Sequence, residues 1–383
     1  MKKLVCVFLT LCMVLSMVAC AAPAAAPAAE PAAPAAEPAA PAPAAEPAAP
    51  APEAAAGALV GVSMPTQDLQ RWNQDGANMK EKFEAAGYEV DLQYANNEVG
   101  TQVSQIENMI ANGAKVLVIA AIDGSTLTSV LGTAKDAGIP VIAYDRLIMN
   151  TDAVSYYCTF DNYMVGTIQG QYIEDQLKLK DAAAGTTFNM EITAGDPGDN
   201  NALYFYQGAI DVLKPYMDNG VIKVVSGQTE FADVATAAWS SETAQSRMES
   251  ILASFYADGT QLDACLCSND STAFGVTTAL ESSYTGKYPI VTGQDCDIAN
   301  TKNIIAGKQS MSIFKDTRTL AAKTVEMVSS ILAGTEVDIN DTSSYDNGTG
   351  IIPTFLCAPV FADINNYQQL LVDSGYYTAD QLQ

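Results

Sequence analysis

From residue 58 to the C-terminus, the sequence alternates short β-rich runs with longer amphipathic helical patterns. This alternation constrains the fold more than any other feature, because it builds a parallel sheet flanked by helices. A continuous apolar run such as 116–120 (VLVIA) fits a strand that is buried on both faces. The pattern restarts near residue 164, so it predicts an α/β fold with two doubly wound parallel-sheet lobes. A length of 383 residues also favours two folded domains.

The individual elements follow from apolar periodicity and from glycine stops. Strands are predicted at 59–64, 89–94, 116–120, 141–144, 155–160, 188–193, 221–225, 263–267, 290–292 and 310–314. Helices are predicted at 70–86, 99–112, 127–137, 164–177, 202–217, 242–256, 272–280, 298–306 and 320–332. The tail, 335–383, shows a less regular pattern.

The N-terminus has the pattern of an export signal. Lys2 and Lys3 precede an apolar stretch over 4–18, which is short for a membrane span, and Ala19 is followed by Cys20. A cysteine at this point is typical of a bacterial lipoprotein, in which Cys20 is lipidated after removal of a signal peptide over 1–20. Secretion with cleavage a few residues later is the alternative. We expect the chain on the outer face of the cell membrane as a lipoprotein, or in the periplasm.

A linker over 21–57 consists almost wholly of Ala, Pro and Glu. Such a composition favours an extended, semi-rigid spacer, and 37 residues at about 3.1 Å each reach on the order of 100 Å. The spacer would hold the folded part away from a membrane surface.

The composition excludes several classes of function. The chain contains no histidine, so a Ser-His-Asp triad, a Cys-His pair and a His-ligated zinc site are impossible. A formal charge of −25 argues against a nucleic-acid partner. Five cysteines remain after Cys20, which is an odd number without a CxxC spacing. We expect these five to be small buried hydrophobic residues, and we expect no metal and no cofactor.

Polar and aromatic side chains collect where the predicted strands end. Ligands of open α/β sheets bind at the carboxyl ends of the strands, so these side chains are candidates for a binding site. Aspartate, asparagine, arginine and lysine satisfy sugar hydroxyls, and indole rings cover sugar C–H faces. Each aspartate or asparagine taken singly also fits an N-cap of the next helix. The residues that collect at these strand ends are Arg71, Trp72, Asp145, Arg146, Asp196, Asp199, Asn200, Asn201, Trp239, Asn269, Asp270, Gln294, Asp295 and Lys315.

Collinear motifs over 58–383 resemble the type I periplasmic sugar-binding receptors of ABC transporters. The resemblance is greatest to the multiple-sugar-binding (ChvE-type) receptors and smaller to the xylose-binding receptors. The motifs are RWNQDG at 71–76, QVSQIENMI at 102–110, KVLVIAAIDG at 115–124, VIAYDRLI at 141–148, YYCTFDN at 156–162, GDPGDNNA at 195–202, VLKPYMDNG at 212–220, CSND at 267–270, VTGQD at 291–295, IFKDTR at 313–318 and VDSGYYTADQL at 372–382.

The resemblance implies three crossings between the lobes, with an N-terminal lobe over 58–161 plus 316–347 and a C-terminal lobe over 162–315 plus 348–383. It implies a monosaccharide of the xylose, glucose or galactose class, bound by hinge closure and delivered to an ABC permease by a monomeric receptor. It also implies sugar contacts at Arg71, Asp145, Arg146, Asp199, Asn201, Trp239, Asp295 and Lys315. Asn269 matches the xylose-binding receptors. Trp72, next to Arg71, is a neighbour of these sugar contacts.

Three other functions compete with a transport receptor. Asp145, Asp199 and Asp295 could supply the carboxylates of a glycoside hydrolase, although no pair is marked as acid and base. A transcription regulator with the same core would carry a basic helix-turn-helix, where this chain has a signal and a linker. A sensor subunit that presents sugar occupancy to a membrane receptor is compatible with the same residues.

Overall fold

A computed structural model describes residues 57–383. The predicted signal peptide, the lipidation site at Cys20 and the linker up to residue 56 lie outside the described residues. No helix within 57–383 combines the length and apolar character that a membrane crossing requires.

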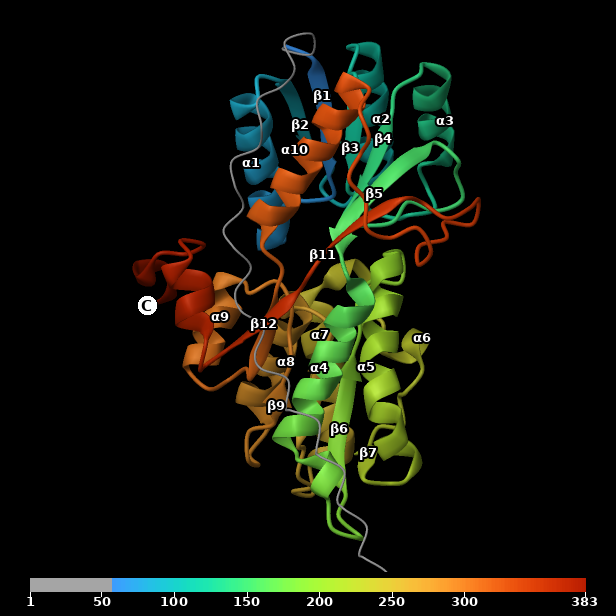
Figure 1. The fold of residues 1–383 in the computed structure, drawn as a ribbon. Helices are drawn as coiled ribbons and strands as arrows, with labels where there is room; N and C mark the ends of the chain where they lie inside the picture. Colours follow the sequence, from blue (N-terminus) through green and yellow to red (C-terminus); the bar gives the residue numbers. More distant parts are fainter. Residues whose placement is uncertain (1–56) are drawn as a thin grey trace, which may run out of the picture. The chain divides into compact units, whose positions relative to one another are not determined.

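The first sheet has six parallel strands in the order β11-β5-β4-β3-β1-β2. The strands are β1 (Leu59–Met64), β2 (Glu89–Tyr94), β3 (Val116–Ile119), β4 (Val141–Tyr144), β5 (Val154–Phe160) and β11 (Thr354–Cys357). The helices around them are α1 (Gln70–Ala85), α2 (Val99–Ala111), α3 (Thr128–Asp136) and α10 (Thr317–Ala333). Figure 1 shows α10, from late in the sequence, beside α1, and the two helices are in contact.

Alternation along the strands divides the apolar residues of this sheet between two cores. Val116 and Val118 of β3 point to one face, where Phe83 of α1 and Leu320 of α10 cover them. Residues 117 and 119 of the same strand point to the other face, which α2 and α3 cover. Helices on both faces explain the uninterrupted apolar run of β3.

The second sheet has four parallel strands in the order β7-β6-β8-β9, and an antiparallel pair β10–β12 lies beside it. Its strands are β6 (Phe188–Thr193), β7 (Ile222–Val224), β8 (Ala264–Cys267), β9 (Ile290–Val291), β10 (Met311–Phe314) and β12 (Val360–Asp363). Its helices are α4 (Asn162–Gln176), α5 (Asn200–Asp218), α6 (Phe231–Val234), α7 (Ser241–Ile251), α8 (Asp270–Ser283) and α9 (Ile298–Ile305). Short helical turns cover Leu179–Asp181, Ala237–Trp239, Leu252–Tyr256, Gln368–Asp373 and Ala379–Leu382.

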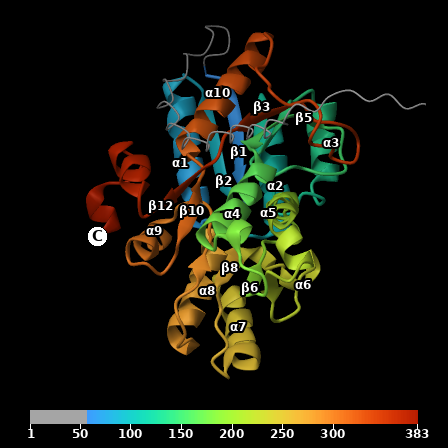
Figure 2. The same cartoon turned by 60° about the horizontal axis from the view of Figure 1, so that its bottom comes forward.

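Helices α4 and α5 lie against one another (Figure 2). A Cβ atom on Gly166 would lie 2.0 Å from the Phe205 carbonyl oxygen, and one on Gly208 would lie 2.2 Å from the Tyr163 carbonyl oxygen. The two glycines therefore allow a close backbone approach, which carries the first turn of α5 toward the first sheet.

The chain passes between the two sheets three times: from β5 to α4, from β10 to α10 and from β11 to β12. The third crossing differs from the predicted lobe boundary at residue 347. Strand β11 pairs in parallel with β5, so 354–357 belong to the first sheet and the chain returns only at β12. The sequence of β11 gave no strand signal, because a four-residue edge strand whose middle residues are half-buried has no marked apolar alternation.

The predicted α/β fold with two parallel sheets flanked by helices is confirmed. The predicted strands and helices up to residue 332 are present, with bounds that differ by a few residues. The five cysteines that follow Cys20 are all buried and unpaired, as expected of small hydrophobic residues. They are Cys158, Cys265, Cys267, Cys296 and Cys357.

Candidate functional site

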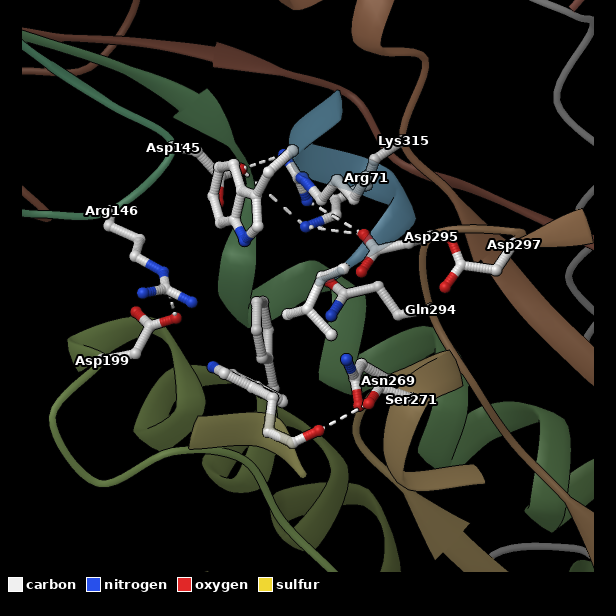
Figure 3. Close-up of a pocket in the computed structure, with 14 residues that line it drawn as sticks. Arg71, Asp145, Arg146, Asp199, Asn269, Ser271, Gln294, Asp295, Asp297 and Lys315 are labelled. Atoms are coloured by element: carbon white, nitrogen blue, oxygen red, sulfur yellow. Dashed lines mark hydrogen bonds and ion pairs between the residues drawn. The ribbon is translucent and has the colours of Figure 1, made fainter. Parts of the chain in front are cut away.

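Nine of the ten predicted contact residues line one cavity between the strand ends of the two sheets (Figure 3). The space that protein atoms do not fill in this cavity, including its opening to solvent, is about 420 Å³. The nine residues are Arg71, Trp72, Asp145, Arg146, Asp199, Trp239, Asn269, Asp295 and Lys315. Leu69, Phe205, Ser271, Gln294 and Asp297 complete the lining.

Apart from Trp239, which lies in the short helical turn Ala237–Trp239, these side chains come from the carboxyl end of a strand or from the first turns of the helix that follows. Asp199 caps α5 by accepting from the Asn201 backbone N–H at 3.0 Å, and Asn269 caps α8 by accepting from Thr272 at 2.9 Å. Both residues also line the cavity, so the capping role and the binding role coincide. Asp145 and Asp295 have left-handed φ angles of 59° and 98°. Such strain at a site of converging polar groups is typical of functional positions.

Arg71 is the centre of a buried ion network. Its Nε donates to Asp75 at 3.0 Å, its Nη1 donates to Asp295 at 2.9 Å, and its Nη2 donates to Asp145. Lys315 Nζ lies 3.2 Å from Asp295 and 3.8 Å from Asp145. Burial lowers the pKa of Arg71, but Asp145 and Asp75 raise it by more. Burial raises the pKa of Asp145, but Arg71 and Lys315 more than offset this effect and leave its pKa lowered.

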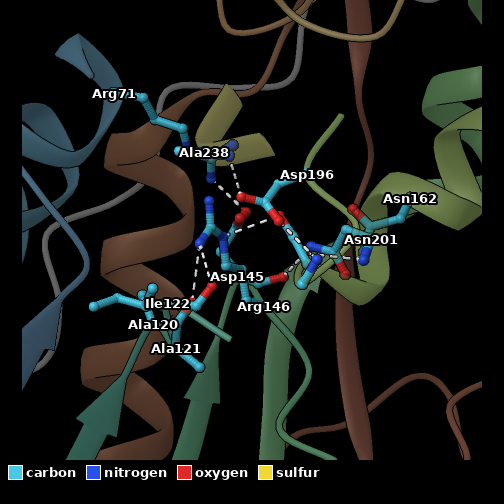
Figure 4. Close-up of polar contacts among 12 residues, drawn as sticks. Arg71, Ala120, Ala121, Ile122, Asp145, Arg146, Asn162, Asp196, Asn201 and Ala238 are labelled. Atoms are coloured by element: carbon cyan, nitrogen blue, oxygen red, sulfur yellow. Dashed lines mark hydrogen bonds and ion pairs between the residues drawn. The ribbon is translucent and has the colours of Figure 1, made fainter. Parts of the chain in front are cut away.

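A second ion pair joins the two sheets. Arg146 follows β4, and its Nε lies 3.0 Å from Asp199 at the start of α5. Its Nη1 donates to the carbonyl oxygens of Ala121 and Ile122 at 3.0 and 3.2 Å (Figure 4). Burial raises the pKa of Asp199, and Arg146 only partly offsets this effect. Each buried cation of the cavity walls is thus paired with at least one aspartate, and this pairing suits a neutral ligand.

Aromatic rings form the apolar part of the walls. The guanidinium carbons of Arg71 and Arg146 lie 5.2 and 5.0 Å from the centre of the Trp72 ring. The Trp239 ring lies against Gly195, where a Cβ atom would be 1.9 Å from a ring carbon. Ring centres of Phe205 and Trp239 are 6.3 Å apart. Indole and phenyl faces of this kind can cover the C–H surface of a sugar ring.

Four buried polar atoms of the cavity lining have no hydrogen-bond partner among the described residues. Two are donors, Arg146 Nε and Trp239 Nε1, and two are acceptors, Gln294 Oε1 and Asp297 Oδ1. Arg146 Nε is near Asp199, but its N–H does not point at the carboxylate in a hydrogen-bonding direction. A buried polar group left unpaired costs about 1–3 kcal/mol, so all four are poised for a ligand that both donates and accepts.

Asn201 is the one predicted contact residue that does not line the cavity. Its side-chain amide donates to the carbonyl oxygen of Asp145 at 2.6 Å, and its Oδ1 lies 3.0 Å from the Tyr157 hydroxyl. It therefore supports Asp145 from behind. The sequence could not separate the two roles, because Asn201 and Asp199 occupy the same strand end.

Sequence reasoning missed four lining residues and one buried partner, and it named Gln294 at a strand end without including it among the sugar contacts. Asp297 and Ser271 lie within two residues of predicted contacts, so the rule of strand ends could have included them. Leu69 and Phe205 gave no polar signal. Asp75, in α1, was also missed, although it is fully buried against Arg71.

Both missed aspartates have a pKa that is shifted toward the neutral form. Burial raises the pKa of Asp75 to about 6 despite Arg71. Burial, and then the negative charge of Asp295, raises the pKa of Asp297 to about 7. Within 57–383, no group of three or more metal-ligating side chains is placed to hold a metal ion.

Known proteins are similar to this chain over most of its length. Residues 60–336 match the model of the periplasmic binding protein domain. The multiple sugar-binding periplasmic receptor ChvE of Rhizobium radiobacter is 49% identical over 327 residues, which cover 84% of this chain and 92% of that protein. The D-xylose-binding periplasmic protein of Escherichia coli K12 is 36% identical over 323 residues, which cover 84% of this chain and 92% of that protein.

One solved structure is similar over the whole of its chain. It is an ABC transporter solute binding protein from Clostridium phytofermentans with bound β-D-glucose. It is 68% identical, with a TM-score of 0.83, and the match covers 85% of this chain and 100% of that one. The resemblance that the sequence motifs indicated is therefore confirmed, as is its order, with the multiple-sugar receptor more similar than the xylose protein.

Proposed function

The chain belongs to the periplasmic binding protein family, and from this premise we propose that it is an exported receptor that binds a neutral monosaccharide and delivers it to an ABC sugar permease. Membership in this family makes the chain a sugar-binding receptor and not an enzyme, so the glycoside hydrolase and the transcription regulator are set aside. The cavity described above is the proposed monosaccharide site.

The observation that carries this proposal is the set of four unpartnered polar atoms in the cavity walls. Two N–H donors and two oxygen acceptors without a hydrogen bond among the described residues belong to side chains that line one cavity beside indole and phenyl rings. A sugar hydroxyl both donates and accepts, so a monosaccharide can satisfy all four groups. Because Arg71, Arg146 and Lys315 are already balanced by aspartates, the ligand need carry no charge.

Hinge closure is the proposed mechanism. Trp72 and Arg146 reach the cavity from the first sheet, Trp239 and Asn269 reach it from the second, and Lys315 lies at the crossing from β10 to α10. A ligand that contacts both sides stabilises the arrangement in which they are close. The permease would then recognise this ligand-bound arrangement.

The proposed ligand class is an aldose such as D-glucose or D-xylose. The solved relative from Clostridium phytofermentans holds β-D-glucose, and the Escherichia coli relative is named for D-xylose. Asn269 matches the xylose-binding receptors and therefore favours D-xylose. One hydroxymethyl group separates these two sugars.

Export and membrane attachment complete the proposal. The basic residues Lys2 and Lys3, the apolar stretch after them and Cys20 support a lipoprotein on the outer face of the membrane. The Ala/Pro/Glu linker that follows supports a folded part held away from the membrane surface, and we propose that the receptor is a monomer.

A sugar titration tests the proposed ligand class. The full chain is titrated with D-glucose, D-xylose, D-galactose and L-arabinose, and binding is read by tryptophan fluorescence and by calorimetry. Saturable binding of one or a few aldoses without turnover is expected, and Trp239→Ala should remove most of the fluorescence response. If neither fluorescence nor calorimetry detected binding of any sugar in the panel, the proposal would be overturned.

A further inference from the structure

A second cavity adjoins the proposed monosaccharide site. The space there that protein atoms do not fill, including the opening to solvent, is about 730 Å³. The two cavities share Leu69, Arg146 and Trp239 as wall residues. The boundary between them thus includes side chains from both sides of the cleft, so the two spaces are neighbours.

Two donors at this boundary make no hydrogen bond to any residue that the structure describes. The Nη1 of Arg146 donates to the carbonyl oxygens of Ala121 and Ile122, whereas its Nε, although 3.0 Å from Asp199, donates no hydrogen bond. Trp239 Nε1 is the second such donor. Both are donors, so an oxygen atom that bridges the two cavities would find a donor on either side of the cleft.

The walls of the second cavity supply hydroxyl acceptors and no uncommitted cation. Gly198 lies between Asp123 and Asp196, since a Cβ atom there would be 3.5 Å from Asp123 Oδ2 and 3.2 Å from Asp196 Oδ1. Asp196 accepts from the backbone N–H groups of Gly198 and Ala238 at 2.6 and 2.5 Å (Figure 4). Neither aspartate has a basic side chain within 4.0 Å among the described residues. Two carboxylates attract hydroxyl donors and repel an anion.

From these contacts we propose that the second cavity is a subsite for the second ring of a neutral disaccharide whose first ring occupies the monosaccharide site. The inference rests on the proposed function and extends its ligand class. Asp123 and Asp196 accept hydroxyl protons of the second ring, and Arg146 and Trp239 face the linkage between the rings. The same carboxylates disfavour a second ring that carries an acid group.

Calorimetry on the full chain tests the subsite. D-glucose and D-xylose are compared with cellobiose, maltose and xylobiose. At least one disaccharide is expected to bind with a Kd within about tenfold of the Kd of its monosaccharide. A disaccharide whose second ring is a uronic acid should bind at least tenfold more weakly than the neutral one.

Two variants of one residue test whether the second ring lies in the second cavity. Val99 lines only the second cavity and is half-buried at the start of α2. Val99→Trp should weaken disaccharide binding at least tenfold and leave monosaccharide binding within twofold. Val99→Ala should leave both unchanged. If Val99→Trp also loses monosaccharide binding, Asn97→Trp, on the same wall, repeats the test.

The outcomes separate this inference from the proposed function. Monosaccharide binding without any disaccharide binding would overturn the subsite alone. Disaccharide binding that Val99→Trp and Asn97→Trp leave intact would also overturn the subsite, because the second ring would lie elsewhere. Absence of binding by every sugar would overturn both.

Discussion

The side-chain amide of Asn201 donates a hydrogen bond of 2.6 Å to the backbone carbonyl oxygen of Asp145. Asp145 follows β4 of the first sheet and Asn201 lies in the first turn of α5 beside the second sheet, so this bond joins the two sides of the cleft. Tyr157 and Thr159 donate to the same carbonyl oxygen, at 2.6 and 2.8 Å. The left-handed backbone of Asp145 is thereby held from three directions.

Replacement of Asn201 tests this support. Asn201→Ala is expected to weaken monosaccharide binding by about tenfold, because a buried hydrogen bond is lost on the residue that positions Asp145. The Kd from calorimetry measures the effect. Asn200→Ala, one residue earlier, is the control and should bind normally. An unchanged Kd for Asn201→Ala would show that Asp145 keeps its position without the amide.

A methyl group at Gly195 is expected to displace the Trp239 ring. Its Cβ atom would lie 1.9 Å from that ring, which is closer than any contact between carbon atoms allows. Gly195→Ala should therefore weaken sugar binding at least tenfold and reduce the fluorescence response. Gly132→Ala in α3 meets nothing within 4 Å and should leave the Kd unchanged. Normal sugar affinity in Gly195→Ala would contradict the role given to this ring.

Sugar affinity is expected to rise with pH through neutrality. The pKa of Asp297 is raised to about 7, and its unpartnered Oδ1 is a proposed acceptor of a sugar hydroxyl. A hydroxyl that donates to the carboxylate favours the ionised form, so binding should strengthen several-fold from pH 6 to pH 8. Asp297→Asn should show a flat profile over this range. A wild-type Kd that does not change between these pH values would exclude Asp297 from the site.

Stability is expected to fall as pH rises from about 4 to about 6. Burial raises the folded-state pKa of Asp75 to about 6, whereas an unfolded aspartate titrates near 3.9. The folded protein therefore binds more protons than the unfolded chain within this window, and the free energy of unfolding drops as they are released. The contribution of Asp75 is on the order of 2–3 kcal/mol, from about 1.4 kcal/mol per pKa unit.

Urea denaturation at several pH values measures this dependence. The decrease between pH 4 and pH 6 should be smaller in Asp75→Asn, because asparagine does not titrate. Asp218→Asn, at an exposed carboxylate of α5, should keep the wild-type profile. If the free energy of unfolding changed equally with pH in wild type and in Asp75→Asn, this result would contradict the raised pKa of Asp75.

Removal of the Cys20 thiol tests the proposed lipid anchor. Cys20→Ser should be exported but recovered outside the membrane fraction, because no acyl chain can be attached. Membrane fractionation of the producing cell measures this change, with Cys158→Ser, a buried cysteine, as the control. Retention of Cys20→Ser in the membrane fraction would contradict lipidation at this residue.

The sequence by itself determined the layers of this protein and the composition of its site. Strands such as β3 carry enough apolar periodicity to be placed without a structure, and in parallel sheets the ends of such strands are where polar side chains collect. The rule found nine of the lining residues because it depends on local order along the chain. It also chose the charged residues that pair with one another, such as Arg146 and Asp199.

Tertiary structure alone decided what depends on contacts between distant segments. Strand β11 joins the first sheet only because β5 offers it an edge, and its own four residues carry no such information. Asn201 and Asp199 are two residues apart, yet one supports Asp145 while the other faces the cavity. The raised pKa of Asp75 and the second cavity beside Trp239 arise from burial and from the approach of the two sheets. These are properties of packing between distant segments, so they cannot be read from the local sequence.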